Sequence, residues 1–439
     1  MRRSRFLACL ASLLLTACSV DLGAGLGGGS GTRATSLVVG DEPFAVRSGA
    51  AILAQGGSAV DAVTATYFAL AVTYPVAAGL GGGGICIVHD AATGRNEEFD
   101  FLARDASGGG AYGVAGNVRG FALMQSVYGI VPWQRVVAPG EGYAAAGFPI
   151  SHALAARLNG AADVVRLDAG LAAEFMDETG KPKPEGSIVS NLDLAQTLAA
   201  LRVGGPNGFY RGQVGAKIID YSQTQGGGIA VSDFTANSAS RNTPQAMQIQ
   251  DAFVYLPSQR LGVGAFAGTL FNQLNGAQAW RTTDLQAALA DAVKRTLATY
   301  AVTDLPADLG ATGFAAVDER GQAAACAVTM NGPFGSGRTA TGTGVTLARA
   351  PSSGQAGLAG AFLTPVIATE GSSGNVSLVG AGAGGPNGTA AIAYALARLG
   401  HDDAVTGAAN SGTTGSYDTV NAIVCQNDVC VALPNRAGP

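Results

Sequence analysis

The feature that most constrains the fold is a long uncharged stretch between Asp61 and His89. Its composition is apolar enough for a membrane span, but Pro75 and the glycines at 81–84 interrupt it. Irregular backbone is not tolerated where it faces lipid, so the stretch is not a transmembrane helix. We interpret it as a buried helix, a glycine-rich turn and a buried strand. Such elements need a large core, which a chain of 439 residues with 47% hydrophobic residues supplies.

Composition also limits the partners of the chain. Only 13% of the residues are charged, the net charge is −5, and no run of basic residues is present. A nucleic-acid partner is therefore not expected, because phosphates are bound by basic patches. The three histidines, His89, His152 and His401, are too scattered in the sequence to form a cluster of metal ligands. We predict no metal site and no cofactor.

The N-terminus has the pattern of an export signal. Three arginines within residues 2–5 precede a short apolar run at 6–15, and the sequence Leu-Thr-Ala-Cys ends at Cys18. This pattern resembles the lipobox of bacterial lipoproteins, which implies removal of residues 1–17, a lipid on Cys18 and a flexible tether over 18–36. The expected location is a cell membrane or outer membrane, with the protein lipid-anchored on the periplasmic side. An ordinary signal peptide that ends near Ala17 is the alternative.

Hydrophobic periodicity predicts a single mixed α/β domain over residues 37–439. Apolar residues at helical spacing predict a helix that ends at the Gly-Gly pair of 56–57, and Ser58 is suited to cap the next helix. The other elements that we expect are hairpins at 85–101, 311–331 and 422–433, a strand at 375–379 and a helix at 389–400.

Cysteine positions leave one disulfide question open. If Asn427-Asp428 forms the turn of the hairpin at 422–433, Cys425 and Cys430 lie opposite each other in a non-hydrogen-bonded pair. The Cα separation at such a pair is ~4.5 Å, at the lower edge of what a disulfide accepts. A disulfide and two free thiols are both open in an oxidising compartment. Cys86 and Cys326 lie in apolar runs, and we expect them to be buried core residues.

One block of the sequence resembles a known enzyme family. Residues 49–84 contain, in order, a helix that ends in Gly-Gly, then Ala-Val-Asp-Ala, a proline and Gly-Leu-Gly-Gly-Gly-Gly. This block is similar to the N-terminal signature of the gamma-glutamyltranspeptidase family. Shorter matches follow in the family's order, at Tyr128-Gly129, Pro132-Trp133, Ala138-Pro139, Gly147-Phe148-Pro149, Gly208-Phe209-Tyr210 and Ser232-Asp233-Phe234.

The resemblance implies both a fold and a chemistry. The implied fold is that of the N-terminal-nucleophile hydrolases, a four-layer αββα sandwich. Members cut themselves into a large and a small subunit, which correspond here to residues 37–310 and 311–439. The new N-terminal threonine attacks gamma-glutamyl amides such as glutathione, and its own α-amine acts as the base. The implied ligand is a small gamma-glutamyl or peptide-like molecule.

The nucleophile position departs from the family pattern. The family motif is Thr, then Thr or Ala, His, an aromatic or apolar residue, Ser, Val, Val and Asp, and the matching stretch is ATGFAAVD at 311–318. A match without gaps places Ala311 at the nucleophile, and a methyl group cannot attack a carbonyl. Thr312 is a candidate nucleophile only if the strand slips by one residue, which would turn the following side chains to the other face. We therefore expect reduced activity or none.

Other parts of the family's site are retained to different degrees. By resemblance, Asn331 contacts the glutamyl group, and the backbone of Gly384 and Gly385 forms the oxyanion hole. Arg104 corresponds, after a two-residue shift, to the arginine that clamps the substrate carboxylate, a role that suits a forked guanidinium. A plain surface arginine is the alternative. The acid that holds the substrate ammonium is missing from residues 347–354.

Three other functions stand beside gamma-glutamyl transfer or hydrolysis. Loss of the nucleophile and of the acid is compatible with a non-catalytic binding protein for a small peptide or amino acid. A structural lipoprotein is a weaker alternative. The glycines at 380–385 also fit Gly-x-Gly-x-x-Gly, with Asp402 and Asp403 at the spacing of a nucleotide-binding acid. The family resemblance already explains these glycines, so we favour it.

Overall fold

The computed structural model describes residues 33–34, 36–259, 262–282, 284–300, 304–399, 417, 419–426 and 429–433. The described residues form one compact unit. The predicted signal peptide, Cys18, most of the tether, Asp402 and Asp403, and the turn at 427–428 lie outside the described residues. Nowhere in the described part is a helix both long and apolar enough to span a bilayer.

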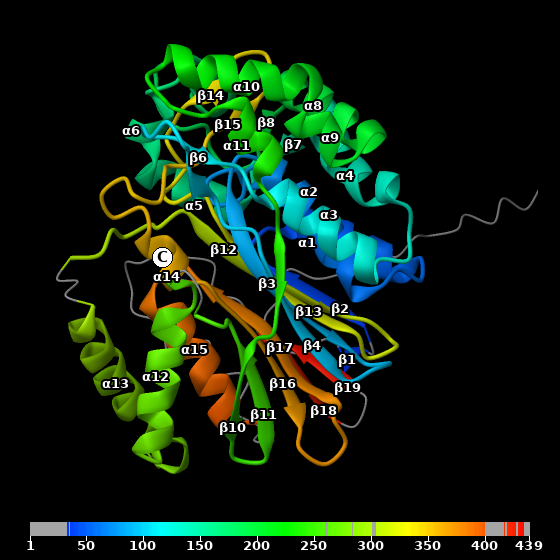
Figure 1. The fold of residues 1–439 in the computed structure, drawn as a ribbon, viewed down its shortest axis with the longest axis vertical. Coiled ribbons are helices and arrows are strands. Elements are labelled where there is room, and N and C mark those ends of the chain that lie inside the picture. The colour runs from blue at the N-terminus through cyan, green and yellow to red at the C-terminus, as the bar shows by residue number, and fades with distance from the viewer. Residues whose placement is uncertain are drawn as a thin grey trace, which may run out of the picture. The chain divides into compact units, whose positions relative to one another are not determined.

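Two antiparallel sheets form the centre of the described structure (Figure 1). The first has six strands, in the order β2 (Leu37–Gly40), β12 (Ala311–Val317), β13 (Ala323–Thr329), β3 (Gly83–Asp90), β4 (Arg95–Asp100) and β9 (Ser240–Asn242). The second has seven strands, in the order β1 (Arg33–Ala34), β19 (Val429–Ala432), β18 (Thr419–Gln426), β17 (Val376–Ala383), β16 (Thr364–Glu370), β11 (Ala252–Leu256) and β10 (Gln245–Ile249). Short ladders pair β5 (Arg104–Asp105) with β6 (Gly113–Val114), β7 (Phe148–Pro149) with β8 (Ile188–Val189), and β14 (Thr339–Ala340) with β15 (Val345–Thr346).

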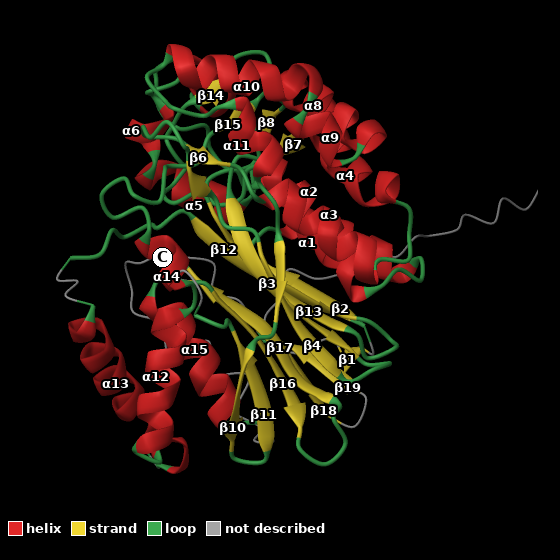
Figure 2. Cartoon of the chain, in the orientation of Figure 1, coloured by secondary structure: helices red, strands yellow, loops and turns green. Residues whose placement is uncertain are grey.

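Helices cover the outer faces of both sheets (Figure 2). The helices that share a core with the six-stranded sheet are α1 (Pro43–Ala54), α2 (Ala59–Thr73), α3 (Asn117–Tyr128), α4 (Trp133–Ala146), α5 (His152–Gly160), α6 (Ala162–Val165), α7 (Ala169–Phe175), α8 (Leu192–Gly204), α9 (Pro206–Tyr210), α10 (Gly212–Thr224) and α11 (Val231–Ala236). Those that share a core with the seven-stranded sheet are α12 (Ala265–Gly276), the short helix η2 (Ala279–Arg281), α13 (Leu285–Thr299), α14 (Leu358–Ala361) and α15 (Pro386–Ala397). The layers are therefore helix, sheet, sheet and helix, which confirms the predicted αββα sandwich.

The uncharged stretch after Asp61 forms the predicted buried helix, turn and strand. Every residue of α2 is buried. Ser58 caps this helix in a capping box with Asp61, as its sequence position indicated. The turn then needs glycine because the backbone approaches other segments closely: a β-carbon at Gly81 would lie 2.2 Å from the carbonyl oxygen of Thr346. The glycine run therefore lets α2 be followed by a strand in the middle of the sheet.

The central strands are apolar on both faces. In β12, Phe314 and Ala316 belong to the core under the helices, whereas Ala315 and Val317 belong to the core between the sheets. This double burial explains why the sequence shows continuous apolar runs instead of alternation. The carboxylate of Asp318, at the end of the strand, accepts a hydrogen bond of 3.1 Å from the backbone nitrogen of Ala59 and so joins the hairpin to the start of α2.

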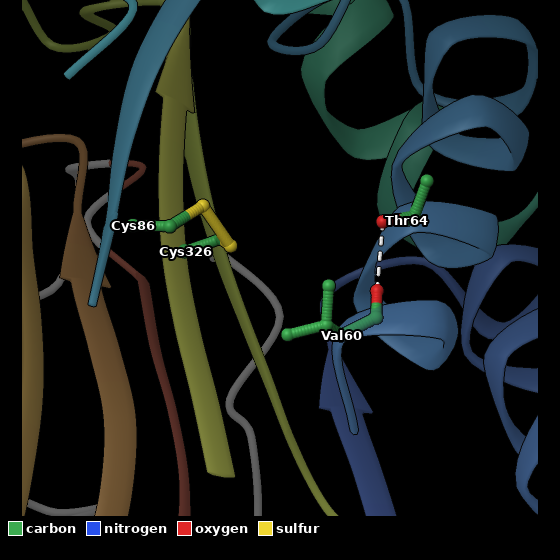
Figure 3. Close-up of a disulfide and its surroundings, with 4 residues drawn as sticks. All are labelled: Val60, Thr64, Cys86 and Cys326. Carbon is green, nitrogen blue, oxygen red and sulfur yellow. Dashed lines mark hydrogen bonds between the residues drawn. A yellow bond between two sulfur atoms is a disulfide. The ribbon is translucent and has the colours of Figure 1, made fainter. Parts of the chain in front are cut away.

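Two disulfides bridge neighbouring strands. The register of β3 and β13 places Cys86 opposite Cys326, and their sulfurs are bonded. Figure 3 shows this bridge on the side of the sheet where α2 lies. The expectation that Cys86 and Cys326 are only core residues is corrected here: both are buried, but the sequence did not show that their strands are adjacent. Cys425 and Cys430 also form a disulfide, which settles the question that the hairpin left open.

Candidate active site

Strand β12 begins at Ala311, the residue that the sequence resemblance aligns with the family's nucleophile. Its side chain is fully buried among apolar residues between the two sheets, including Ala381 and Ala383. The peptide groups before and after Ala311 are both held by hydrogen bonds. The hydroxyl of Thr329 donates to the carbonyl of Gly310 at 2.9 Å, and Nη1 of Arg157 donates to the carbonyl of Ala311 at 3.2 Å. The backbone here is fixed, but Ala311 has no atom that can act as a nucleophile.

Thr312 lies on the opposite face of the strand and is engaged in a buried network. Its hydroxyl donates to Oδ2 of Asp41 at 2.5 Å, and the amide of Asn421 donates to Oδ1 of Asp41 at 2.7 Å. Thr312 is fully buried, and Asp41 and Asn421 are 6% and 1% exposed. The same amide donates to the carbonyl of Gly313 at 2.8 Å, which fixes the register of the strand. A ligand outside the sheet cannot reach this hydroxyl without a rearrangement of the strand.

A cavity of about 520 Å³ opens beside the segment that leads into β12. Its walls come from the end of α5, the segment before β12, the turn after β13, the loop after β15 and one residue near β18. The lining residues are Gly160, Pro306, Ala307, Asp308, Leu309, Asn331, Gly332, Pro333, Arg349, Ser353, Gly354, Gln355, Ala356 and Tyr417. The cavity therefore brings Asn331, one of the predicted site residues, close to the start of the strand.

An ion pair supports the wall of this cavity. Arg157 of α5 is 2% exposed, and its Nε donates to Asp308 at 2.8 Å while its Nη2 contacts the other carboxylate oxygen. Burial lowers the pKa of Arg157, but the Asp308 carboxylate outweighs this effect and keeps the pKa above its usual range. The guanidinium is therefore charged, and the charge of Asp308 is already compensated.

Asn331 and Arg349 form one unit at the cavity. Asn331 has a left-handed backbone, with φ 60°, and its side-chain amide donates to the carbonyl of Arg349 at 2.9 Å. Nε of Arg349 donates to the carbonyl of Gly335 at 2.9 Å. Sequence reasoning identified Asn331 but missed Arg349. One sequence signal could have identified Arg349: it lies in the stretch 347–354, where the resemblance led us to expect an acid and none is present.

Arg104 is exposed on β5 and is not among the residues that line the cavity. Its neighbour Asp105 has a clear role, because Oδ1 accepts hydrogen bonds from the backbone nitrogen and the hydroxyl of Ser352, at 3.0 and 2.9 Å. Asp105 thereby holds the loop that follows Arg349. The structure does not bring Arg104 together with Asn331 in the described cavity, so its role as a carboxylate clamp stays a prediction.

Gly384 and Gly385 lie between β17 and α15, next to the start of β12. Ala383, just before them, packs in the same apolar cluster as Ala311. Gly385 is the N-cap of α15 and makes no side-chain cap, so backbone amides at this helix start are suited to an anion.

Opposite Ala383, the buried hydroxyl of Thr419 has no hydrogen-bond partner among the described residues. No sequence pattern singled out Thr419.

The glycines at 380–385 do not form a dinucleotide-binding loop. Strand β17 is antiparallel to both of its neighbours, β16 and β18. A dinucleotide site of this kind needs a parallel βαβ unit, so the nucleotide alternative is wrong on topology. Among the described residues, no three His, Cys, Asp or Glu side chains gather in a way that could hold a metal ion.

Comparisons with known proteins agree with this architecture. A family model described as gamma-glutamyltranspeptidase matches residues 45–107 and 102–304, which together span more than half of the chain. The chain belongs to the gamma-glutamyltranspeptidase family. The match is continuous through the helical region and ends just before the segment that leads into β12, so the resemblance of the signature at 49–84 is confirmed.

Curated relatives match parts of this family member. The glutathione hydrolase proenzyme of Escherichia coli (strain K12) is 32% identical over 230 residues, which cover 47% of this chain and 39% of that protein. Glutathione hydrolase 2 of Arabidopsis thaliana is 31% identical over 217 residues, 46% of this chain and 37% of that protein. Acylase ACY 1 proenzyme of Pseudomonas sp. (strain V22) is 29% identical over 303 residues, 62% of this chain and 54% of that protein. The chain thus spans only about a third to a half of the length of these relatives.

Solved structures share the fold. A cephalosporin acylase from Bacillus halodurans superposes with a TM-score of 0.71 at 17% identity, over 95% of this chain and 98% of that one. The gamma-glutamyltranspeptidase of Helicobacter pylori superposes with a TM-score of 0.54 at 25% identity, over 59% of this chain and 81% of that one. The first likeness concerns the fold alone. Together they confirm the N-terminal-nucleophile hydrolase type of sandwich.

Proposed function

We propose that this family member is an exported, lipid-anchored protein that binds a small amino-acid or peptide-like ligand and cleaves neither itself nor that ligand. The observation that carries the proposal is the first residue of β12. Ala311 has no hydroxyl, and without a nucleophile there is neither acyl transfer nor self-cleavage by the family's route.

The neighbouring threonine supports the same conclusion. Thr312 is turned to the opposite face and donates its hydroxyl to the buried Asp41. A one-residue slip that brought it to the nucleophile position would break this bond and the bond from Asn421 to Gly313. It would also turn Phe314 from the helix-side core to the core between the sheets. Each of these changes opposes the slip.

Ligand binding is supported by what the site retains. The cavity beside residue 309 has about 520 Å³, which is within the range of small-molecule sites. Asn331 lies in its wall, and the backbone amides near Gly385 are suited to an anion. These parts do not depend on a nucleophile, so binding can persist after catalysis is lost.

Glutathione hydrolysis tests the proposal directly. The full-length protein, purified in detergent, is incubated with glutathione, and the E. coli glutathione hydrolase that resembles it serves as the positive control. We expect no glutamate above the blank without enzyme. Glutamate release that disappears in Thr312→Ala would overturn the proposal and assign the catalytic role to Thr312.

Export and lipid anchoring are a separate part of the proposal. They are supported by the signal-like sequence that ends at Cys18 and by the two disulfides, which are typical of oxidising compartments. Cells grown with radiolabelled palmitate should label the wild-type protein and not Cys18→Ser. An unlabelled wild-type protein that appears in the soluble periplasmic fraction would favour an ordinary signal peptide instead.

A further inference from the structure

Among the described residues of the cavity wall, one positive charge has no counter-charge. The charged residues of this described lining are Asp308 and Arg349. Asp308 is already held by the buried Arg157 through both carboxylate oxygens. Arg349 donates through Nε to a backbone carbonyl, and its two terminal nitrogens have no hydrogen-bond partner among the described residues. Within the described part of the chain, the cavity therefore presents a guanidinium that has no carboxylate partner.

The position of this guanidinium is set by the turn after β13. The backbone nitrogen of Arg349 donates to the carbonyl of Met330 at 3.2 Å, and the amide of Asn331 donates to the carbonyl of Arg349. Gly332 leaves room for the side chain: a β-carbon at this position would lie 3.2 Å from both Cζ and Nε of Arg349. The bond from Nε to Gly335 fixes one edge of the guanidinium, and the terminal nitrogens are the part left for a ligand.

We propose that Arg349 binds the carboxylate of a small peptide-like ligand that has no ammonium group at that end, such as a carboxyl-terminated acyl amide. The proposal rests on the binding function proposed above and narrows its ligand class, because it excludes free α-amino acids. A guanidinium pairs with a carboxylate through two parallel hydrogen bonds. It repels an ammonium, and the stretch 347–354 offers no acid to hold one. The cavity thus favours a negatively charged ligand group and disfavours the positively charged α-amino group.

Glutarate and L-glutamate form a matched pair of probes, because they differ only in the α-ammonium group. Binding to the full-length protein in detergent is measured by isothermal titration calorimetry, at ligand concentrations up to ~10 mM because a single ion pair gives weak binding. The variants are Arg349→Gln, which removes the charge, and Arg349→Lys, which keeps the charge but loses the fork. Arg135→Gln is the control, since Arg135 is an exposed residue of α4 that does not line the cavity.

We expect wild type and Arg135→Gln to bind glutarate at least about tenfold more tightly than L-glutamate. Arg349→Gln should lose about tenfold or more in glutarate affinity and with it the preference, and Arg349→Lys should be intermediate. Equal or tighter binding of L-glutamate, no glutarate binding by the wild type, or an unchanged affinity in Arg349→Gln would each overturn the inference. The glutathione assay is independent of these outcomes, so a failure of the ligand class is distinct from a failure of the non-catalytic function.

Discussion

Replacing Asp308 by asparagine should lower the free energy of unfolding by about 3–5 kcal/mol, although the side chain keeps its size. The partner of Asp308, Arg157, is 2% exposed, and its charge is balanced in the described structure by this carboxylate. The Asp308→Asn variant would leave a buried guanidinium without a counter-charge, which costs more than the hydrogen bonds alone. Arg157 also donates to the carbonyl of Ala311, so the same variant should loosen the entry to β12.

Urea unfolding followed by circular dichroism measures this change, and the chain contains a matched control. Asp163 pairs with Arg166 on the surface, where the two side chains are 100% and 47% exposed. Asp163→Asn should change the free energy of unfolding by no more than about 1 kcal/mol. The claim that Asp308 balances the buried charge of Arg157 would be refuted by either of two results. The free energy of unfolding of Asp308→Asn could fall by less than about 1 kcal/mol, or by no more than that of Asp163→Asn.

Three further perturbations have defined outcomes. Burial raises the pKa of Glu42 from 4.5 to about 7. The resulting contribution to stability, about 3 kcal/mol, should be fully present below pH 4.5 and lost as the pH rises to about 7, and Glu42→Gln should remove this pH dependence in urea titrations. Thr312→Val should cost about 1–3 kcal/mol in urea, because it removes the hydroxyl that donates to the buried Asp41. Cys86→Ala should cost about 5 kcal/mol and Cys425→Ala about 2 kcal/mol in urea, since the first disulfide closes a loop of 240 residues and the second a loop of 5.

Each of these has an outcome that would contradict it. A wild-type pH profile that Glu42→Gln leaves unchanged would assign the titration to another group. Thr224→Val, at an exposed position, is the control for Thr312→Val, and equal costs for the two would remove the argument for a buried network. Full stability of Cys86→Ala under oxidising conditions would mean that the β3–β13 bridge does not form.

Local sequence signals were sufficient for the elements around the site. Ser58 predicted the start of α2, and the apolar runs predicted the hairpins of β3–β4 and β12–β13. The helix after β17 begins at Pro386, three residues before the predicted 389, because proline is favoured in the first turn. That error concerns only the boundary of one helix. The order of strands in each sheet depends on contacts between distant parts of the sequence, and for that reason the disulfide of Cys86 was missed.

The site was predictable only where it follows from one strand. The period of two along β12 places Ala311 and Thr312 on opposite faces, and the structure agrees. The partners of Thr312 come from far along the chain, and no pattern in the sequence links Asp41 with Asn421. The sequence showed only that the stretch containing Arg349 lacks the family's acid. The sequence does not show the contacts that hold Arg349 against the turn after β13.

The mass of the intact, reduced protein is the most direct test of the central claim, that Ala311 leaves this family member without a nucleophile. Protein purified from membranes and analysed by mass spectrometry should give one polypeptide that runs unbroken through residues 310–312. The sample must be reduced, because the bridge from Cys86 to Cys326 would hold two fragments together. Two chains, the smaller beginning at Thr312, would contradict the account.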